Sequence, residues 1–170
     1  MHATSGIKIN LAKCAVAQKQ VEYLGHLVSK DGIAMIPSYV EKVLSWPMPT
    51  TGKELRSFLG FTSYYRSFIK EYAHLTHEMN KLKNDKTVPL AWPDEVKDKF
   101  EKLKACFSNA PVRGFPEYQS ENKFILDCDW SATNMAAVLS QVQQGREVFL
   151  GCAARKCSKS EKSYPAHKGN

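Results

Sequence analysis

The fold of this chain is decided in residues 50–72, TTGKELRSFLGFTSYYRSFIKEY. Thr51 and Glu54 form a capping box, in which Thr51 reaches forward and Glu54 reaches back to satisfy free amide donors at a helix start. Mostly apolar residues then recur at steps of three and four: Leu55, Phe58, Leu59, Thr62, Tyr65, Phe68 or Ile69, and Tyr72. This period predicts one long amphipathic helix with a broad apolar stripe.

The opposite face of this predicted helix is basic. It carries four cations and one aromatic residue, namely Lys53, Arg56, Arg66, Lys70 and Tyr64. Basic residues interleaved with tyrosine suit a surface that follows a phosphate backbone. The same spacing is also typical of an ordinary amphipathic helix with a solvated cationic face, so both interpretations stand at this level.

Length, composition and charge limit the number of domains and the class of partner. The chain has 170 residues, 43% of them hydrophobic, which is enough for one medium domain or two small ones. A net charge of +7 fits a nucleic-acid partner, and it also fits a merely soluble basic protein. No apolar run approaches the roughly 20 residues of a membrane span, so we expect no membrane partner.

The cysteines indicate the compartment. Five are scattered along the chain without a CxxC pair or a histidine at zinc-ligand spacing: Cys14, Cys106, Cys128, Cys152 and Cys157. An odd number without a pairing framework favours reduced thiols. The first ten residues also lack the apolar centre of a secretory signal. We therefore expect an intracellular protein, cytoplasmic or nuclear.

Residues before the long helix predict a β-hairpin and a short helix. The hairpin covers residues 21–36, with its turn at residues 30–32, and Pro37 stops its second strand. Ser38 and Glu41 form a second capping box. A short helix is therefore expected from about residue 39 to residue 46.

Residues after the long helix predict two further helical pieces and then a sheet. The first piece covers about residues 74–83, and the second begins at Trp92-Pro93-Asp94. Three strands are expected at residues 123–129, 135–142 and 146–153, with a turn at residues 143–145 between the last two. The fold class is thus α+β: a β-hairpin, a helical bundle and the start of a three-stranded antiparallel sheet. Three regions are expected, at residues 1–37, 38–110 and 111–170.

The amino-acid sequence of the predicted long helix resembles a known protein family. The runs Leu55–Gly60 and Tyr65–Ile69 resemble the thumb of reverse transcriptases from gypsy-type LTR retrotransposons and retroviruses. The resemblance implies a partner, an RNA–DNA hybrid or a duplex template–primer. It makes four residues of this segment candidate nucleic-acid contacts: Lys53, Arg56, Tyr64 and Arg66.

A second match precedes the thumb. Tyr23-Leu24-Gly25-His26 and Trp46-Pro47-Met48-Pro49 resemble the end of the polymerase palm in the same family. In that family the Leu-Gly-His hairpin is the primer grip, which implies that Leu24, Gly25 and His26 position a primer end. Glycine permits close backbone approach, and a histidine can donate to a phosphate. A purely structural role for His26 in a turn is the alternative.

A third match begins at the sheet. Asp129-Trp130-Ser131 and Ala137–Gln141 resemble the start of the family's ribonuclease H domain. That domain uses two Mg²⁺ ions held by carboxylates, so the resemblance makes Asp129 the candidate catalytic and metal-binding residue. Asp127 lies two residues earlier and so shares the strand face of Asp129. It either supports Asp129 from outside the set of metal ligands or is simply an exposed residue. Alternation puts Phe124, Leu126 and Cys128 on the opposite face, which we expect to be buried.

The match also breaks in three places. No Tyr-x-Asp-Asp polymerase motif is present, Asn170 stands where the family has a metal-binding glutamate six residues after Tyr164, and the later ribonuclease H aspartates are missing. We therefore expect a reverse transcriptase/ribonuclease H fragment that is inactive alone and binds no metal tightly, with the remaining polyprotein segments as partners. The alternatives are a non-catalytic nucleic-acid-binding module, a connection-type domain of a domesticated or decayed retroelement, or a non-functional remnant.

Overall fold

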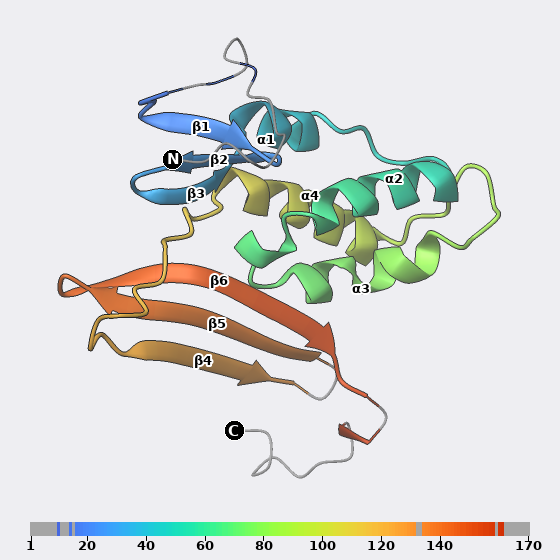
Figure 1. Cartoon of the computed structure of the whole chain (residues 1–170). Coiled ribbons are helices and arrows are strands. Elements are labelled where there is room, and N and C mark those ends of the chain that lie inside the picture. Colours follow the sequence, from blue (N-terminus) through green and yellow to red (C-terminus); the bar gives the residue numbers. More distant parts are fainter. Residues whose placement is uncertain (1–9, 11–13, 15, 132–133, 159, 162–170) are drawn as a thin grey trace, which may run out of the picture.

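The structure is a computed structural model that describes residues 10, 14, 16–131, 134–158, 160 and 161. Within these residues the chain forms two three-stranded antiparallel sheets and four α-helices (Figure 1). The helices pack together beside the first sheet and over one face of the second. Strands come first, then helices, then a three-stranded sheet, which confirms the predicted α+β class.

The first sheet is a three-stranded meander and not the single hairpin that the sequence predicted. Its strands are β1 (Gln20–Tyr23), β2 (His26–Ser29) and β3 (Gly32–Met35). The predicted turn at residues 30–32 joins β2 to β3, and a second turn at Leu24-Gly25 divides the expected first strand. The missed turn has positive φ at both central residues, 46° at Leu24 and 75° at Gly25. This is the geometry of a tight two-residue hairpin turn. The sequence did not indicate it, because leucine rarely adopts positive φ.

Helix α1 (Pro37–Leu44) begins earlier than predicted. Its N-cap is Ile36, which has no side-chain cap, so the expected Ser38–Glu41 capping box is wrong. Pro37 occupies the first helical position, where its missing N–H leaves no donor without a partner. That proline starts the helix two residues before the serine could cap it.

Helix α2 (Gly52–Ser63) starts as predicted, at Thr51. The Thr51 hydroxyl accepts a hydrogen bond from the Glu54 amide at 3.2 Å. The Glu54 carboxylate reaches back one residue further than the capping box predicts, to the Thr50 amide at 2.7 Å. The hydrogen bonds that the Thr50 amide and hydroxyl donate to this carboxylate hold the pKa of Glu54 below its usual value.

The long helix of residues 50–72 is broken, although the burial of its stripe was predicted correctly. The chain leaves α2 at Ser63, passes through the 3-10 turn η2 (Arg66–Phe68) and enters α3 (Tyr72–Leu82). The Tyr72 hydroxyl lies 3.0 Å from the Thr62 hydroxyl oxygen. In a straight helix these two residues would stand about 15 Å apart, so this contact requires α3 to fold back on α2.

The main core lies among the helices. Helix α4 (Asp94–Ser108) contributes the four predicted residues, and all of them are buried: Val96, Phe100, Leu103 and Phe107. The rings of Phe58 and Phe100 are 4.7 Å apart at their centroids, which ties α2 to α4. Among the described residues no helix is long and apolar enough to cross a membrane.

The second sheet consists of β4 (Phe124–Trp130), β5 (Asn134–Gln143) and β6 (Arg146–Lys156), close to the predicted bounds. A tight turn at Gln144-Gly145 joins β5 to β6, again with positive φ at both residues. Asp127 and Asp129 share the face that lies toward the helices. The opposite face is not buried as expected, because the helices pack only on the aspartate side, and Leu126 is 61% exposed. The correction applies to three residues, Phe124, Leu126 and Cys128.

Candidate nucleic-acid interface

The turn between β1 and β2 presents Leu24 and Gly25 at the surface. Leu24 is 70% exposed, and Gly25 is half-buried. Gly25 is confined on its inner side: a Cβ there would lie 3.3 Å from Cε1 of Tyr64. The turn therefore lies tightly on the helical region and exposes its outer edge.

Two consecutive tyrosines hold this turn. The Tyr65 hydroxyl donates to the Gly25 carbonyl oxygen at 2.6 Å, and the Tyr64 hydroxyl donates to the Leu24 carbonyl oxygen. Burial raises the pKa of Tyr65 to about 12, so its hydroxyl keeps the proton that it donates. Both tyrosines sit where α2 ends, which explains why the predicted long helix gives way at this point.

His26 closes the same cluster. Its Nδ1 lies 3.1 Å from the Leu24 carbonyl oxygen and 3.4 Å from the Tyr64 hydroxyl oxygen. A carbonyl oxygen only accepts, so the shorter contact is a hydrogen bond when Nδ1 carries the proton. The imidazole also stacks on Phe68, with 5.7 Å between the centroids. These contacts hold His26 in the turn, and its contact with a primer stays a prediction.

The predicted basic residues do not form one cluster with the turn. Lys53 and Arg56 lie near the start of α2, whereas Tyr64 follows its end, and a helix of this length spans about 18 Å. Arg66 lies in η2, beside the tyrosines, and is exposed. The structure thus brings Leu24, Gly25, His26 and Tyr64 together and leaves two of the cations at a distance.

Arg56 has a structural contact of its own. Its Nη1 donates to the Lys83 carbonyl oxygen at 2.6 Å, just beyond the end of α3. Helix C-termini leave carbonyl oxygens without intrahelical donors, and a guanidinium there satisfies one of them. Arg56 therefore joins α2 to α3.

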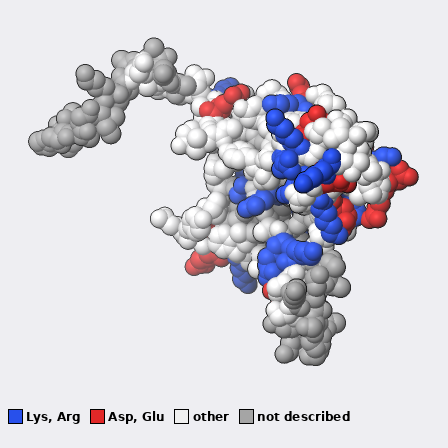
Figure 2. Space-filling view, turned by 90° about the vertical axis from the view of Figure 1, so that its right-hand side faces the viewer, with Lys and Arg blue, Asp and Glu red and all other residues white. Residues whose placement is uncertain are grey.

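Figure 2 shows the charge on the face that carries α2 and α3. Lys and Arg side chains gather across this face, with some Asp and Glu side chains among them and others at its edge. Lys53 and Lys70 are both exposed. A broad cationic field of this kind draws a polyanion toward the helices.

Within the part of the chain that the structure describes, Asp129 does not lie in a cluster of metal ligands. It lines a cavity of about 310 Å³ under α3, together with Lys70, Glu71 and His74. Among the described residues no group of three or more His, Cys, Asp or Glu side chains is placed to hold a metal ion. The described residues around Asp129 do not fit a two-metal centre, and they support no catalytic step through one. Tyr164 and Asn170 lie outside the described residues.

Sequence reasoning missed two residues that build the turn site, Tyr65 and Phe68. Both were assigned to the apolar stripe, and both are buried. A usable signal was present in the Tyr64-Tyr65 pair, because a tyrosine in a buried stripe needs a partner for its hydroxyl. The partner could not be named without the fold, since it is a backbone carbonyl 40 residues away.

Comparison with known proteins places the chain in a family. A profile described as an RNase H-like domain found in reverse transcriptase matches residues 92–170. The retrovirus-related Pol polyprotein from transposon 297 of Drosophila melanogaster is 40% identical over 139 residues, 82% of this chain and 13% of that protein. The transposon Tf2-3 polyprotein of Schizosaccharomyces pombe is 34% identical over 157 residues, 92% of this chain and 12% of that protein.

Solved structures agree in fold. A foamy viral protease-reverse transcriptase in complex with an RNA/DNA hybrid has a TM-score of 0.75 and 17% identity, covering 93% of this chain and 21% of that chain. The same type of protein in complex with dsDNA has a TM-score of 0.74 and 16% identity, covering 89% of this chain and 31% of that chain. The chain spans less than a fifth of the length of the transposon polyproteins named above. The chain is a retroelement reverse transcriptase/ribonuclease H-like segment, and its homologues are retrotransposon Pol polyproteins.

Proposed function

We propose that this chain binds template–primer duplexes and RNA–DNA hybrids without sequence preference, as the end of the palm and the thumb of a reverse transcriptase. The observation that carries the proposal is the docking of the Leu24-Gly25 turn on Tyr64 and Tyr65. This contact fixes an exposed turn against the thumb-like helices. A primer end and the adjoining duplex can then contact one preformed surface.

The electrostatics of this surface support the proposal. Arg66 is exposed and directly follows Tyr65, so it can contact phosphates beside the turn, and phosphate contacts release condensed counterions. Binding should therefore weaken steeply as salt rises. The two foamy viral structures of similar fold are described as complexes with dsDNA and with an RNA/DNA hybrid, which makes the same ligands reasonable here.

We propose that catalysis is a property of the longer polyprotein. The sequence lacks the Tyr-x-Asp-Asp polymerase motif, and Asp129 is the single ribonuclease H carboxylate that the resemblance identifies. One carboxylate cannot hold two Mg²⁺ ions. DNA synthesis on an RNA template and cleavage of RNA in hybrids would then require the other polymerase and ribonuclease H segments.

The binding proposal is tested by fluorescence anisotropy with a labelled RNA–DNA hybrid at salt concentrations between about 50 and 200 mM. The logarithm of the binding constant should fall linearly with the logarithm of the salt concentration. Arg66→Ala should reduce the slope by about 0.9, the value of one lost phosphate contact. Arg146→Ala is the matched control, because Arg146 is an exposed arginine at the remote β5–β6 turn. Equal effects of the two changes would refute the proposed surface.

The turn has a separate test. Leu24→Ala should weaken binding of a hybrid with a recessed primer end, because it trims the exposed edge of the turn. Val88→Ala is the control, since Val88 is also 70% exposed but lies in the loop between α3 and α4. If both variants bind as tightly as the unaltered chain, the turn does not contact the primer.

A further inference from the structure

Arg113 contacts all three parts of the fold. It lies in the segment that connects α4 to β4, and this segment contains no helix or strand of its own. Its backbone pairs with the first sheet, and its side chain reaches both η2 and the second sheet.

The backbone contact with the first sheet is reciprocal. The Ile33 amide donates to the Arg113 carbonyl oxygen at 2.7 Å, and the Arg113 amide donates to the Ile33 carbonyl oxygen at 2.8 Å. The next residue, Gly114, donates from its amide to the Phe149 carbonyl oxygen of β6 at 2.7 Å. A Cβ on Gly32 would stand 2.2 Å from the Arg113 carbonyl oxygen, so this approach requires glycine there.

The guanidinium joins η2 to β6. Its Nε donates to the Leu150 carbonyl oxygen at 2.8 Å, and its Nη1 donates to the Ser67 hydroxyl at 3.0 Å. Its central carbon lies 5.2 Å from the centroid of the Phe68 ring, within the range of a cation–π contact. A planar group with donors in several directions can bridge two elements in this way, whereas a lysine ammonium has no equivalent fork.

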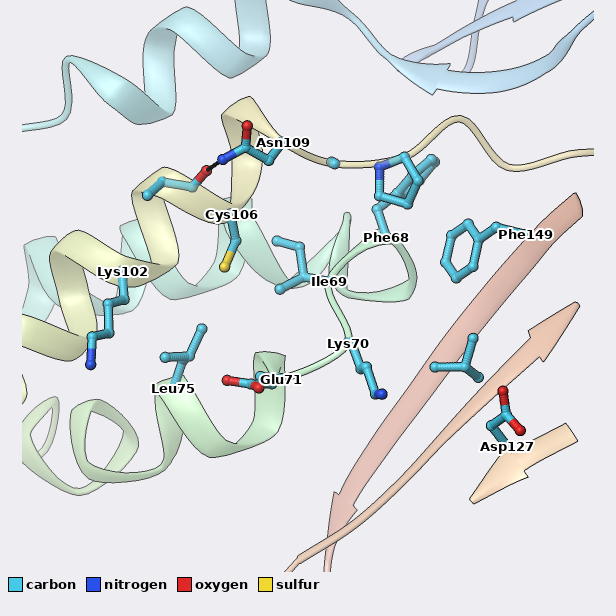
Figure 3. A pocket seen from close by; sticks show the side chains of 14 residues that line it. Phe68, Ile69, Lys70, Glu71, Leu75, Lys102, Cys106, Asn109, Asp127 and Phe149 are labelled. Atoms are coloured by element: carbon cyan, nitrogen blue, oxygen red, sulfur yellow. Dashed lines mark hydrogen bonds between the residues drawn. The ribbon is translucent and has the colours of Figure 1, made fainter. Parts of the chain in front are cut away.

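Elsewhere the second sheet meets the helices loosely. A cavity of about 680 Å³ separates them, lined from the helical side by Ile69 and Leu75 and from the sheet by Asp127 and Phe149 (Figure 3). Phe68 and Phe149 lie at the end of this cavity that is closer to Arg113. The close polar contacts are therefore concentrated at one end of the interface.

We propose that Arg113 is a positioning residue that locks the β4–β6 sheet onto η2 and β3. With the guanidinium in place the three parts form one rigid body, and without it the sheet can swing away about the connection. This lock does not rest on the proposed nucleic-acid binding, and its test needs no nucleic acid.

Cys152 reports on the lock. It lies on the inner face of β6, and its thiol donates to the Ser67 carbonyl oxygen at 3.2 Å. Burial raises its thiol pKa, and the Arg113 charge lowers it in part, so the rates of the variants are compared as limiting rates at high pH, where the thiol is ionised in each. Cys128 lies on the exposed face of β4 and should react at the same rate whether the interface is closed or open. The experiment is alkylation of the whole chain with iodoacetamide, followed by mass spectrometry of each cysteine peptide.

Arg113→Ala should raise the alkylation rate of Cys152 by about tenfold, because two hydrogen bonds and a ring contact that close the interface are lost. The rate of Cys128 should not change. A far-UV circular dichroism spectrum equal to that of the unaltered chain shows that the variant is folded. A folded variant in which Cys152 reacts as slowly as before would overturn the proposal.

Two milder variants keep the test decisive if Arg113→Ala does not fold. Ser67→Ala removes one of the two hydrogen bonds and should raise the Cys152 rate by a smaller factor. Arg113→Lys keeps the charge without the planar fork, and it should also accelerate Cys152. Rates equal to that of the unaltered chain in both variants would overturn the lock.

Discussion

The hydroxyl of Tyr65 donates a hydrogen bond of 2.6 Å to the carbonyl oxygen of Gly25, across 40 residues of sequence. Gly25 forms the exposed turn between β1 and β2, and Tyr65 follows the last turn of α2. This bond ends the long helix and docks the turn at the same time. Tyr64 holds the same turn through the Leu24 carbonyl oxygen, so the protonation of the Tyr65 hydroxyl should set part of the stability of the turn.

The first prediction concerns pH. Burial raises the pKa of Tyr65 to about 12 from its ordinary 10.0, so the folded state favours the neutral phenol. Its contribution to stability is fully present below pH 10, the ordinary value, and is lost as pH rises from there through 12. The free energy of unfolding in urea should therefore fall over this range.

Tyr65→Phe is the control for that decline. The variant should be less stable by about 1 kcal/mol at neutral pH, because a hydrogen bond is lost. The difference in unfolding free energy between the two proteins should shrink as pH rises through the same range. A difference that stays constant would mean that folding does not change the pKa of Tyr65.

The second prediction separates backbone strain from close approach. Gly25 and Gly145 both have a φ of 75°. A Cβ at Gly25 would meet the Tyr64 ring at 3.3 Å, whereas a Cβ at Gly145 would meet none of the described residues within 4 Å. Each change to alanine should cost about 1 kcal/mol for the left-handed backbone, and Gly25→Ala should cost more because its Cβ would press on the ring. Equal unfolding free energies for the two variants would show that the turn is not packed against Tyr64.

The third prediction distinguishes two cations of α2. Arg56→Ala should lower the free energy of unfolding by about 1 kcal/mol, because the Lys83 carbonyl oxygen loses its charged donor. Lys53→Ala should leave stability within about 0.5 kcal/mol, as expected for an exposed surface residue. Urea unfolding measures both. This result would assign any loss of nucleic-acid binding in Arg56→Ala partly to altered structure.

The fourth prediction concerns Mg²⁺. The chain should not cleave an RNA–DNA hybrid, and millimolar Mg²⁺ should leave its melting temperature unchanged, because a ligand that does not bind the folded state does not stabilise it. Asp129→Asn should behave in the same way as the unaltered chain. Metal-dependent turnover, or a rise in melting temperature, that disappears in Asp129→Asn would establish a metal site at this strand.

Much of the architecture could be read from local patterns. The helix start at Thr51 follows from a side chain that can bond an amide three residues ahead. The three strands of the second sheet follow from alternation and from the Gln-Gly turn. The burial of Leu55, Phe58 and Leu59 follows from helical spacing within α2. In each case the cause lies within a few residues of its effect, so the sequence by itself determines the outcome.

Tertiary contacts decided the rest. Thr62 and Tyr72 share one hydrogen bond only because the chain folds back, and no local propensity signals that reversal. The exposed face at Leu126 depends on which side of the sheet the helices cover, and alternation alone does not choose between two faces. Tyr65 at the turn and Arg113 at the lock both donate hydrogen bonds to backbone carbonyl oxygens, and every residue carries such an oxygen. A sequence pattern therefore cannot name these partners, because only the folded chain brings the chosen carbonyl within reach of its donor.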